Sequence, residues 1–175
     1  MEKIIRLKEA INVSKKLRHQ GKTIVLVGGC FDILHVAHVK FLQNAKKQGD
    51  ALFVLLESDN NVRKLKGKNR PINTQKNRAM VIAALTSVDY VVPLSNLKSD
   101  ADYDKVVSQI RPSIIATTAK DPNILHKKRQ ANQIKGRVVY VLKRISDQST
   151  TRLAKLIGQD LLWNKFSLSF LYYLF

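Results

Sequence analysis

Two histidines, His35 and His38, stand three residues apart directly after a glycine-containing stretch, and their type and spacing suit the handling of phosphate. Residues at positions i and i+3 share one face of a helix, so both imidazole rings can face the same ligand. A neutral imidazole donates a hydrogen bond and gains a proton as negative charge builds up beside it. Gly28 and Gly29 let backbone amides approach an anion without a Cβ in the way. This stretch therefore predicts a phosphate-binding site.

The segments around this stretch predict the elements that must position it. Five short apolar segments, most of them rich in β-branched residues, are predicted as β-strands: 23–28, 51–58, 89–94, 113–118 and 137–142. Helical spacing or capping residues predict helices between them: 3–20, 36–48, 74–87, 102–111 and 122–135, with a final helix from about Ser149. The polar, basic segment 59–73 is interpreted as a loop or a broken helix.

Alternation of strands and helices favours an α/β fold, namely a Rossmann-like, doubly wound, parallel five-stranded sheet in a single domain. Ligands of such sheets bind at the carboxyl ends of the strands, beside the topological switch point. The two histidines follow the first strand, so they are expected at that edge. A helix N-terminus at this place would add a positive dipole worth up to about 2 kcal/mol toward an anion.

Length and composition allow one domain of 175 residues with a sizeable core. We divide the chain into an N-terminal helix (1–21), the main domain (22–158) and an apolar C-terminal extension (159–175). A single cysteine, Cys30, excludes an internal disulfide and is compatible with a cytoplasmic location. The apolar tail 161–175 is shorter than the roughly 20 residues of a membrane span. It is interpreted as a helix packed on the core or on a dimer partner, as an interfacial anchor, or as a poorly ordered end.

The formal net charge of +18 favours anionic partners: nucleotides, phosphorylated metabolites, nucleic acid or an acidic membrane surface. The excess exceeds what a small ligand needs, and a solvated basic surface is the alternative explanation. Two basic runs, 63–70 and 126–129, have the same two interpretations, and the first could also form a flap over a triphosphate. Few aromatic residues lie among these charges, so a nucleic-acid surface is not favoured.

The run GGCFDILHVAH (28–38) resembles the GxFDxxHxGH signature of the cytidylyltransferase-like nucleotidyltransferases. The likeness continues in the same order through AKKQGDALFV (45–54), LKGKNRPINTQKNRAMVIAALTSVDYVV (65–92) and RISDQSTTRL (144–153). Within that family, the adenylyltransferase domains of ADP-heptose synthases and the glycerol-3-phosphate cytidylyltransferases have the most similar motifs. The resemblance covers most of the chain between residues 21 and 153.

The resemblance implies a site in which His35 and His38 hold a triphosphate and stabilise the transition state. It implies further catalytic roles for Lys46 and Arg144. It implies nucleotide contacts from a second group: Gly29, Cys30, Phe31, Asp32, Arg78, Ser149, Thr150 and Thr151. Asp32 is expected to hold the loop rather than to transfer a proton. Cys30 is expected to be a small packing residue of the turn and not a nucleophile, because this chemistry requires no thiolate.

The implied reaction transfers AMP or CMP from a nucleoside triphosphate to a phosphorylated small molecule, with a sugar phosphate as the expected acceptor and pyrophosphate as the leaving group. ATP is favoured over CTP. An anionic acceptor is already nucleophilic, so positioning and charge neutralisation can supply the catalysis. Magnesium is expected on the triphosphate itself and no protein metal site is predicted, because the sequence shows no carboxylate cluster. Family membership also implies a homodimer.

The chain departs from the family pattern at two places. Ala37 replaces the glycine of HxGH, which we expect to weaken nucleotide binding without abolishing it. After the fourth strand, relatives carry an acidic GD or GGD element, whereas here Ala119 and Lys120 occupy that position and Asp121 is displaced. The alternative function is therefore a catalytically degenerate member of the same fold that binds nucleotide or RNA.

Overall fold

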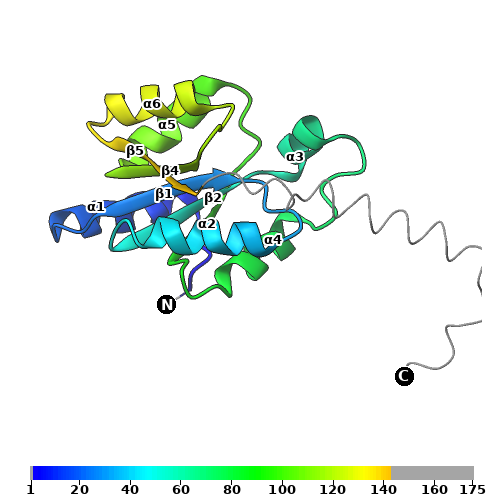
Figure 1. Cartoon of the computed structure of the whole chain (residues 1–175), viewed down its shortest axis with the longest axis horizontal. Coiled ribbons are helices and arrows are strands. Elements are labelled where there is room, and N and C mark those ends of the chain that lie inside the picture. The colour runs from blue at the N-terminus through cyan, green and yellow to red at the C-terminus, as the bar shows by residue number, and fades with distance from the viewer. Residues whose placement is uncertain (1, 143–175) are drawn as a thin grey trace, which may run out of the picture.

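The computed structural model describes residues 2–142, which form one five-stranded sheet with helices on both faces (Figure 1). The strands are all parallel, in the order β3-β2-β1-β4-β5. Their bounds are β1 (Ile24–Gly29), β2 (Ala51–Leu56), β3 (Tyr90–Pro93), β4 (Ile114–Thr118) and β5 (Arg137–Leu142). This confirms the predicted Rossmann-like, doubly wound fold. The order reverses at β1, so the topological switch point lies between β1 and β4.

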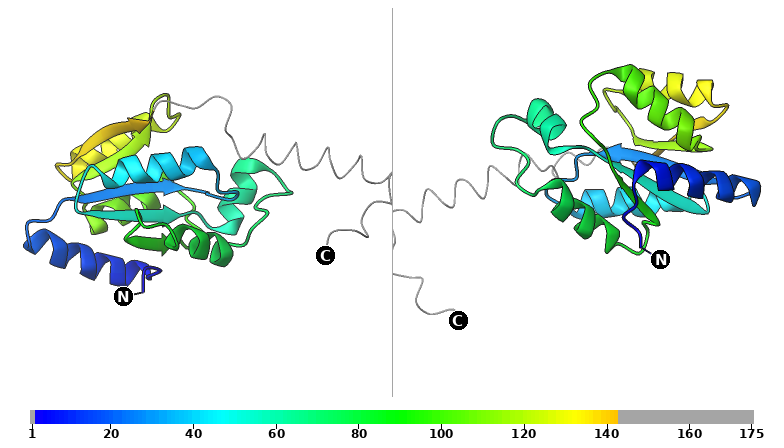
Figure 2. Two further views of the ribbon diagram at one scale, coloured as in Figure 1. Left: turned by 60° about the horizontal axis from the view of Figure 1, so that its bottom comes forward. Right: turned by 180° about the vertical axis from the view of Figure 1, so that it is seen from behind.

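Helices connect every pair of consecutive strands, and α1 precedes the first. Their bounds are α1 (Leu7–His19), α2 (Val36–Lys46), α3 (Asp59–Lys66), α4 (Gln75–Ala83), α5 (Asp100–Ile110) and α6 (Ile124–Gln133). Figure 1 shows α5 and α6 on one face of the sheet, α2 and α4 on the other, and α3 beyond the end of β1. In Figure 2, α1 lies along the sheet, and Ile4 ahead of it forms a bridge with Val91 of β3.

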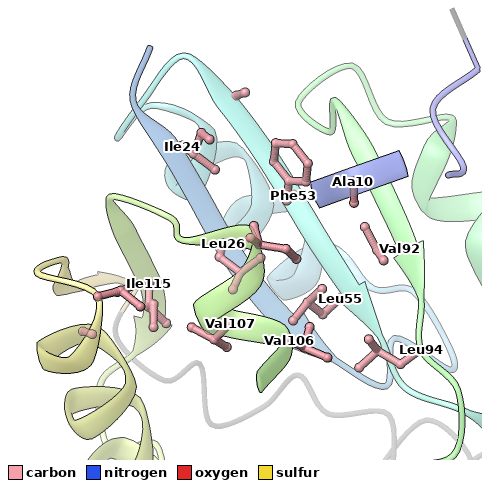
Figure 3. Close-up of a cluster of buried hydrophobic side chains, with 14 residues drawn as sticks. Ala10, Ile24, Leu26, Phe53, Leu55, Val92, Leu94, Val106, Val107 and Ile115 are labelled. Atoms are coloured by element: carbon pink, nitrogen blue, oxygen red, sulfur yellow. The ribbon is translucent and has the colours of Figure 1, made fainter. Parts of the chain in front are cut away.

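Two hydrophobic clusters cover the two faces of the sheet, because side chains alternate along buried strands. Phe53 and Leu55 of β2 face α1 and α5, whereas Leu52 and Val54 face α2 and α4. Figure 3 shows the first cluster, in which Val106 and Val107 of α5 approach the sheet. β2 is buried along its whole length, as its continuous apolar run predicts.

Capping residues explain where two helices begin. Thr74 accepts a hydrogen bond from the amide of Asn77 at 3.3 Å, as its predicted capping role requires, and α4 then ends at Ala83, before the predicted end at residue 87. Ser58 accepts one from the amide of Asn61 at 3.2 Å and starts α3 inside the segment interpreted as a loop or broken helix. Within residues 2–142, no helix is long and apolar enough to cross a membrane.

Replacement of Leu42 by alanine tests the packing of α2, the helix that follows the histidines. Leu42 is fully buried, so Leu42→Ala should lower the free energy of unfolding by about 2–5 kcal/mol. Leu125→Ala is the matched control, since Leu125 lies in α6 with 76 % of its surface exposed and should cost below about 0.5 kcal/mol. Urea unfolding measures both, and equal losses would contradict the described core.

Candidate functional site

The turn after β1 is held in an unusual conformation by Phe31. This residue is buried yet has a φ of 45°, in the left-handed region that bulky residues rarely adopt. Its ring lies against Gly29, where an added Cβ would stand 2.8 Å from Phe31 Cε2. Glycine at position 29 is therefore required by the Phe31 ring. Unfavourable backbone conformations of this kind cluster at functional sites.

His35 and His38 come together at the start of α2, as their spacing predicted. Their rings stack with centroids 3.8 Å apart and an interplanar angle of 23°. Phe31 meets the His38 ring edge-on, with centroids 5.1 Å apart. The Nδ1 atoms of both histidines are buried without a hydrogen-bond partner among residues 2–142. Buried polar atoms are normally paired, so two neighbouring unpaired imidazole nitrogens point to a ligand.

The surroundings keep both imidazoles neutral. Burial lowers the pKa of His35. Burial and the neighbouring His35 lower the pKa of His38 to about 4, although a backbone hydrogen bond with Ile33 opposes the shift. Two protonated rings at this separation would repel each other by about 4 kcal/mol at an effective dielectric constant of about 20. An anion bound beside the stacked pair would oppose this shift and favour protonation.

The N-terminus of α2 contributes backbone amides at the same place. His35 is its N-cap residue, and the helix has neither a side-chain cap nor an acidic residue in its first turn. Its first amides and its positive dipole end are therefore available to an anion. Ala37 lies inside α2 and is not among the residues with positive φ, so the backbone does not require glycine there. Alanine is also a better helix former than the glycine of the family motif.

Asp32 fixes the loop that follows α3. Its carboxylate accepts hydrogen bonds from the amides of Ile72 and Asn73 at 2.9 Å and forms an ion pair with Arg70. Its backbone oxygen accepts a further bond from Asn73 Nδ2 at 3.0 Å. Although burial raises the pKa of Asp32, the hydrogen bonds from residues 73, 72 and 70 hold it below its usual value. Asp32 thus stays ionised and holds the loop.

Arg78 is buried in the middle of this edge, with 1 % of its surface exposed. Its guanidinium donates to the backbone oxygens of Cys30, Glu57 and Asn73, the last two at 2.7 and 3.1 Å. It also donates to Asp59 Oδ1 at 2.8 Å. The structure therefore brings Arg78 beside the turn after β1 but directs its side chain onto protein oxygens. The sequence does not single out Glu57, Asp59 and Asn73. Glu57 and Asp59 are polar residues just after β2, whereas Asn73 lies just before Thr74, the N-cap of α4.

Lys46 is not brought to the histidines. Its Nζ lies 2.7 Å from Asp89 Oδ2, and that carboxylate also accepts from the amide of Leu52 at 2.7 Å. Leu52 is at the amino end of β2, whereas His35 and His38 follow the carboxyl end of β1. The length of α2, roughly 1.5 Å per residue, separates Lys46 from the pair. In this arrangement Lys46 fastens the far end of α2 to the sheet.

The segment after β4 lies on the other side of the switch point. Asp121 accepts a hydrogen bond from Thr117 Oγ1 and lies 2.6 Å from Lys127 Nζ. Although burial raises the pKa of Asp121, the bonds from Lys127 and Thr117 lower it overall. Lys120, with a φ of 62°, precedes Asp121 and is exposed. The displaced acidic residue is thus internally paired, and the exposed charge at this place is positive.

The remaining predicted site residues, Arg144, Ser149, Thr150 and Thr151, lie outside the described residues, as do the predicted final helix and the extension 159–175. Cys30 is partly buried, and burial raises the pKa of its thiol, which suits a packing role better than a nucleophilic one. Among residues 2–142, no group of three or more His, Cys, Asp or Glu side chains could hold a metal ion.

Comparison with known proteins gives a consistent match over this region. The cytidylyltransferase-like family model matches residues 26–158. Among curated proteins, bifunctional protein HldE of Aliarcobacter butzleri is 45 % identical over 107 residues, which are 61 % of this chain and 22 % of that protein. HldE of Nitratiruptor sp. is 48 % identical over 103 residues, or 59 % of this chain and 21 % of that protein. The chain thus spans about a fifth of the length of these relatives.

Two solved structures share the fold. A lipopolysaccharide core biosynthesis protein from Thermoplasma volcanium has a TM-score of 0.57 at 26 % identity, covering 71 % of this chain and 98 % of that one. A pantoate-beta-alanine ligase from Francisella tularensis, solved with an ATP analogue and beta-alanine, has the same TM-score at 14 % identity, covering 95 % of this chain and 82 % of that one. At that identity, the second likeness concerns the fold alone.

The low pKa of His38 makes stability depend on pH. The folded-state pKa is about 4 and the unfolded value is 6.5, so the unfolded chain binds more protons between these values. Acidification from pH 7 to pH 5 should therefore lower the free energy of unfolding by on the order of 1–2 kcal/mol through His38. His38→Gln should lose this share, and His126→Gln, at an exposed position, should retain it. Urea unfolding at the two pH values measures the difference, and identical pH dependences in all three proteins would contradict the assignment.

Removal of the Arg78 guanidinium should destabilise the whole edge. Arg78→Met leaves Asp59 and several buried carbonyl groups without their donor, and we expect a loss of about 3–5 kcal/mol. Arg129→Met is the matched control, because Arg129 pairs with Asp104 at the surface and should cost about 0–1 kcal/mol. Chemical denaturation of both variants measures these values. A loss for Arg78→Met as small as that of the control would show that the guanidinium network is dispensable.

Proposed function

The chain belongs to the cytidylyltransferase-like family, and we propose that it transfers a nucleotidyl group from a nucleoside triphosphate to a sugar phosphate, with release of pyrophosphate. The observation that carries this proposal is the stacked His35–His38 pair with two buried, unpaired Nδ1 atoms at the uncapped start of α2. Such a place offers hydrogen-bond donors and a positive dipole end to a polyphosphate. The resemblance to ADP-heptose synthase adenylyltransferase domains supports ATP over CTP and a sugar phosphate as acceptor.

The proposed step is an in-line displacement at the α-phosphorus. An oxygen of the acceptor phosphate forms a bond to this phosphorus while the bond to the pyrophosphate oxygen breaks, and pyrophosphate leaves with the electron pair. His35, His38 and the α2 amides would donate hydrogen bonds to the phosphate oxygens, where charge builds up in the transition state. No general base is required, because the acceptor phosphate is already ionised. Gly29 and Phe31 would shape the turn around the phosphates, and Asp32 and Arg78 would hold it.

Magnesium and a second copy of the chain complete the proposal. When bound, magnesium neutralises charge on the triphosphate oxygens. The described residues fit an ion that arrives with the nucleotide rather than one held in a protein cage, since they include no group of three or more His, Cys, Asp or Glu side chains placed to bind a metal. Arg144 and the Ser149–Thr151 hydroxyls are proposed as further phosphate contacts, and a homodimer is proposed on the family resemblance.

A non-catalytic nucleotide- or RNA-binding protein is the second candidate. The observation that favours it is the internal pairing of Asp121 with Lys127, which leaves no free carboxylate where relatives carry their acidic element. Against this candidate, Ala37 has no positive φ, so its side chain causes no backbone strain next to His35 and His38. The two candidates differ in whether a bound triphosphate is ever cleaved.

Calorimetric titration with ATP and CTP in the presence of magnesium tests the proposed site. Wild type should bind one nucleotide more tightly than the other. His38→Ala should weaken binding by about tenfold or more, since hydrogen bonds to a charged group are worth roughly 1.5–3 kcal/mol. Lys46→Ala is the comparison variant and should retain the wild-type affinity, because Lys46 pairs with Asp89 at the opposite edge of the sheet.

Several results of this titration and of the assays that follow it would contradict the proposal. If neither nucleotide binds, or if His38→Ala binds as wild type does, the histidines do not form a triphosphate site. If a nucleotide binds but no pyrophosphate is released from it with any aldose phosphate of a panel, the protein is the non-catalytic binding protein and not the proposed enzyme. RNA affinity that falls steeply with salt would then identify the alternative ligand.

A further inference from the structure

A cavity opens at the same edge of the sheet, between α3 and the start of α5. Its volume is about 250 Å³. The segment after β3 forms one wall through Leu97 and Lys98, and α3 forms the other through Asn61, Lys64 and Leu65. Ligands of parallel sheets bind at this edge, so the position is suited to a substrate.

The interior wall of the cavity is a fixed set of hydrogen-bonding groups. Tyr103 Oη donates to Glu57 Oε2 at 3.0 Å. Asn61 Nδ2 donates to Tyr103 Oη and to the backbone oxygen of Leu97, both at 3.0 Å. Asn61 is only 6 % exposed, which locks this arrangement. Burial and the negative charge of Glu57 raise the pKa of Tyr103, so its hydroxyl keeps its proton. With these donors paired inside the protein, the Tyr103 oxygen keeps a free acceptor site, which can take the proton of a ligand hydroxyl.

The rim of the cavity combines positive charge with an apolar surface. Lys64 and Lys98 both line it, and neither side chain forms a hydrogen bond or ion pair within residues 2–142. Asp100 is at the rim too, paired with His126 at 3.2 Å. Leu65, 64 % exposed, adds an apolar surface against which a sugar ring can pack. Unpaired ammonium groups beside hydroxyl-recognising side chains suit a phosphorylated polyol.

Glu57 connects this cavity to the histidine site. Its amide donates to the backbone oxygen of Gly29 at 3.1 Å, and its own backbone oxygen accepts from Arg78 at 2.7 Å. One residue thus accepts a hydrogen bond from Tyr103 of the cavity wall through its side chain and contacts the turn after β1 through its backbone. A ligand in the cavity would therefore lie beside a nucleotide held at that turn.

We propose that the cavity between α3 and α5 binds the sugar-phosphate acceptor, with its hydroxyls on Asn61 and Tyr103 and its phosphate on Lys64 and Lys98. This inference rests on the proposed function and assigns the second substrate of the same reaction to named residues. The positive charge at the rim also explains how an anionic acceptor can approach without the acidic element after β4.

Amide NMR of the full chain tests the assignment with three probes: glucose, inorganic phosphate and glucose 1-phosphate. Glucose 1-phosphate should shift the amides of 61–65 and 97–103 in a saturable manner. It should bind about tenfold more tightly than either glucose or inorganic phosphate, because only glucose 1-phosphate engages both parts of the cavity. A Lys64→Ala/Lys98→Ala double variant should weaken its binding about tenfold. Lys105→Ala/Lys128→Ala, at exposed positions of α5 and α6, is the matched control and should bind as wild type does.

Three outcomes would overturn the inference. These are an absence of saturable shifts at 61–65 and 97–103 up to about 10 mM probe, equal affinities for inorganic phosphate and glucose 1-phosphate, and equal affinities in the two double variants. Titration of the same sample with ATP and magnesium separates this failure from failure of the proposed function. If ATP shifts the amides of residues 28–38 but glucose 1-phosphate leaves those of the cavity unchanged, only the assignment of the cavity is refuted. If ATP causes no shifts, the proposed nucleotide site is refuted.

Discussion

The buried guanidinium of Arg78 is the interaction on which the functional edge of this molecule depends. It lies between the ends of β1 and β2, the start of α3 and the loop before α4, and it satisfies backbone oxygens that would otherwise be buried without donors. Strands and helices pair their backbone groups internally, whereas loops do not. An edge made of several loops therefore needs side chains that donate hydrogen bonds to its backbone oxygens. A planar guanidinium with five N–H groups can serve all of them at once, and a lysine cannot.

This rigid edge explains how two histidines can be kept neutral and ready for an anion. Asp32 and Arg78 fix the turn. Phe31 adopts a positive φ within this turn, and the Phe31 ring contacts the His38 ring edge-on. Burial of that imidazole costs free energy without a ligand, and binding of a polyphosphate would recover it by supplying hydrogen-bond acceptors and negative charge. Ala37 is compatible with this arrangement because α2 continues through it in ordinary helical geometry. The substitution therefore leaves the backbone of α2 unstrained.

The sequence predicted the architecture and the histidine pair well, because both depend on local patterns. β-Branched runs identified most of the strands, a continuous apolar run identified β2, and the i, i+3 spacing predicted that His35 lies beside His38. What the sequence could not predict was where long cations point. Lys46 and Arg78 stand in motifs that imply phosphate contact, yet their targets, Asp89 and a set of backbone oxygens, are distant in sequence. Likewise, the sequence does not decide between a loop and a broken helix at α3, because its polar residues pair with Tyr103 and Arg78, and no local pattern reveals these contacts.

The central claim is that the neutral histidine pair receives the phosphates of a nucleoside triphosphate. The most direct test is an NMR titration of the imidazole groups with pH, with and without ATP and magnesium. The account predicts a pKa of about 4 for His38 in the free protein, and a rise of at least about one unit when the nucleotide supplies negative charge beside the ring. A pKa for His38 that is the same in the two titrations, while ATP binds, would place the triphosphate elsewhere and contradict the account.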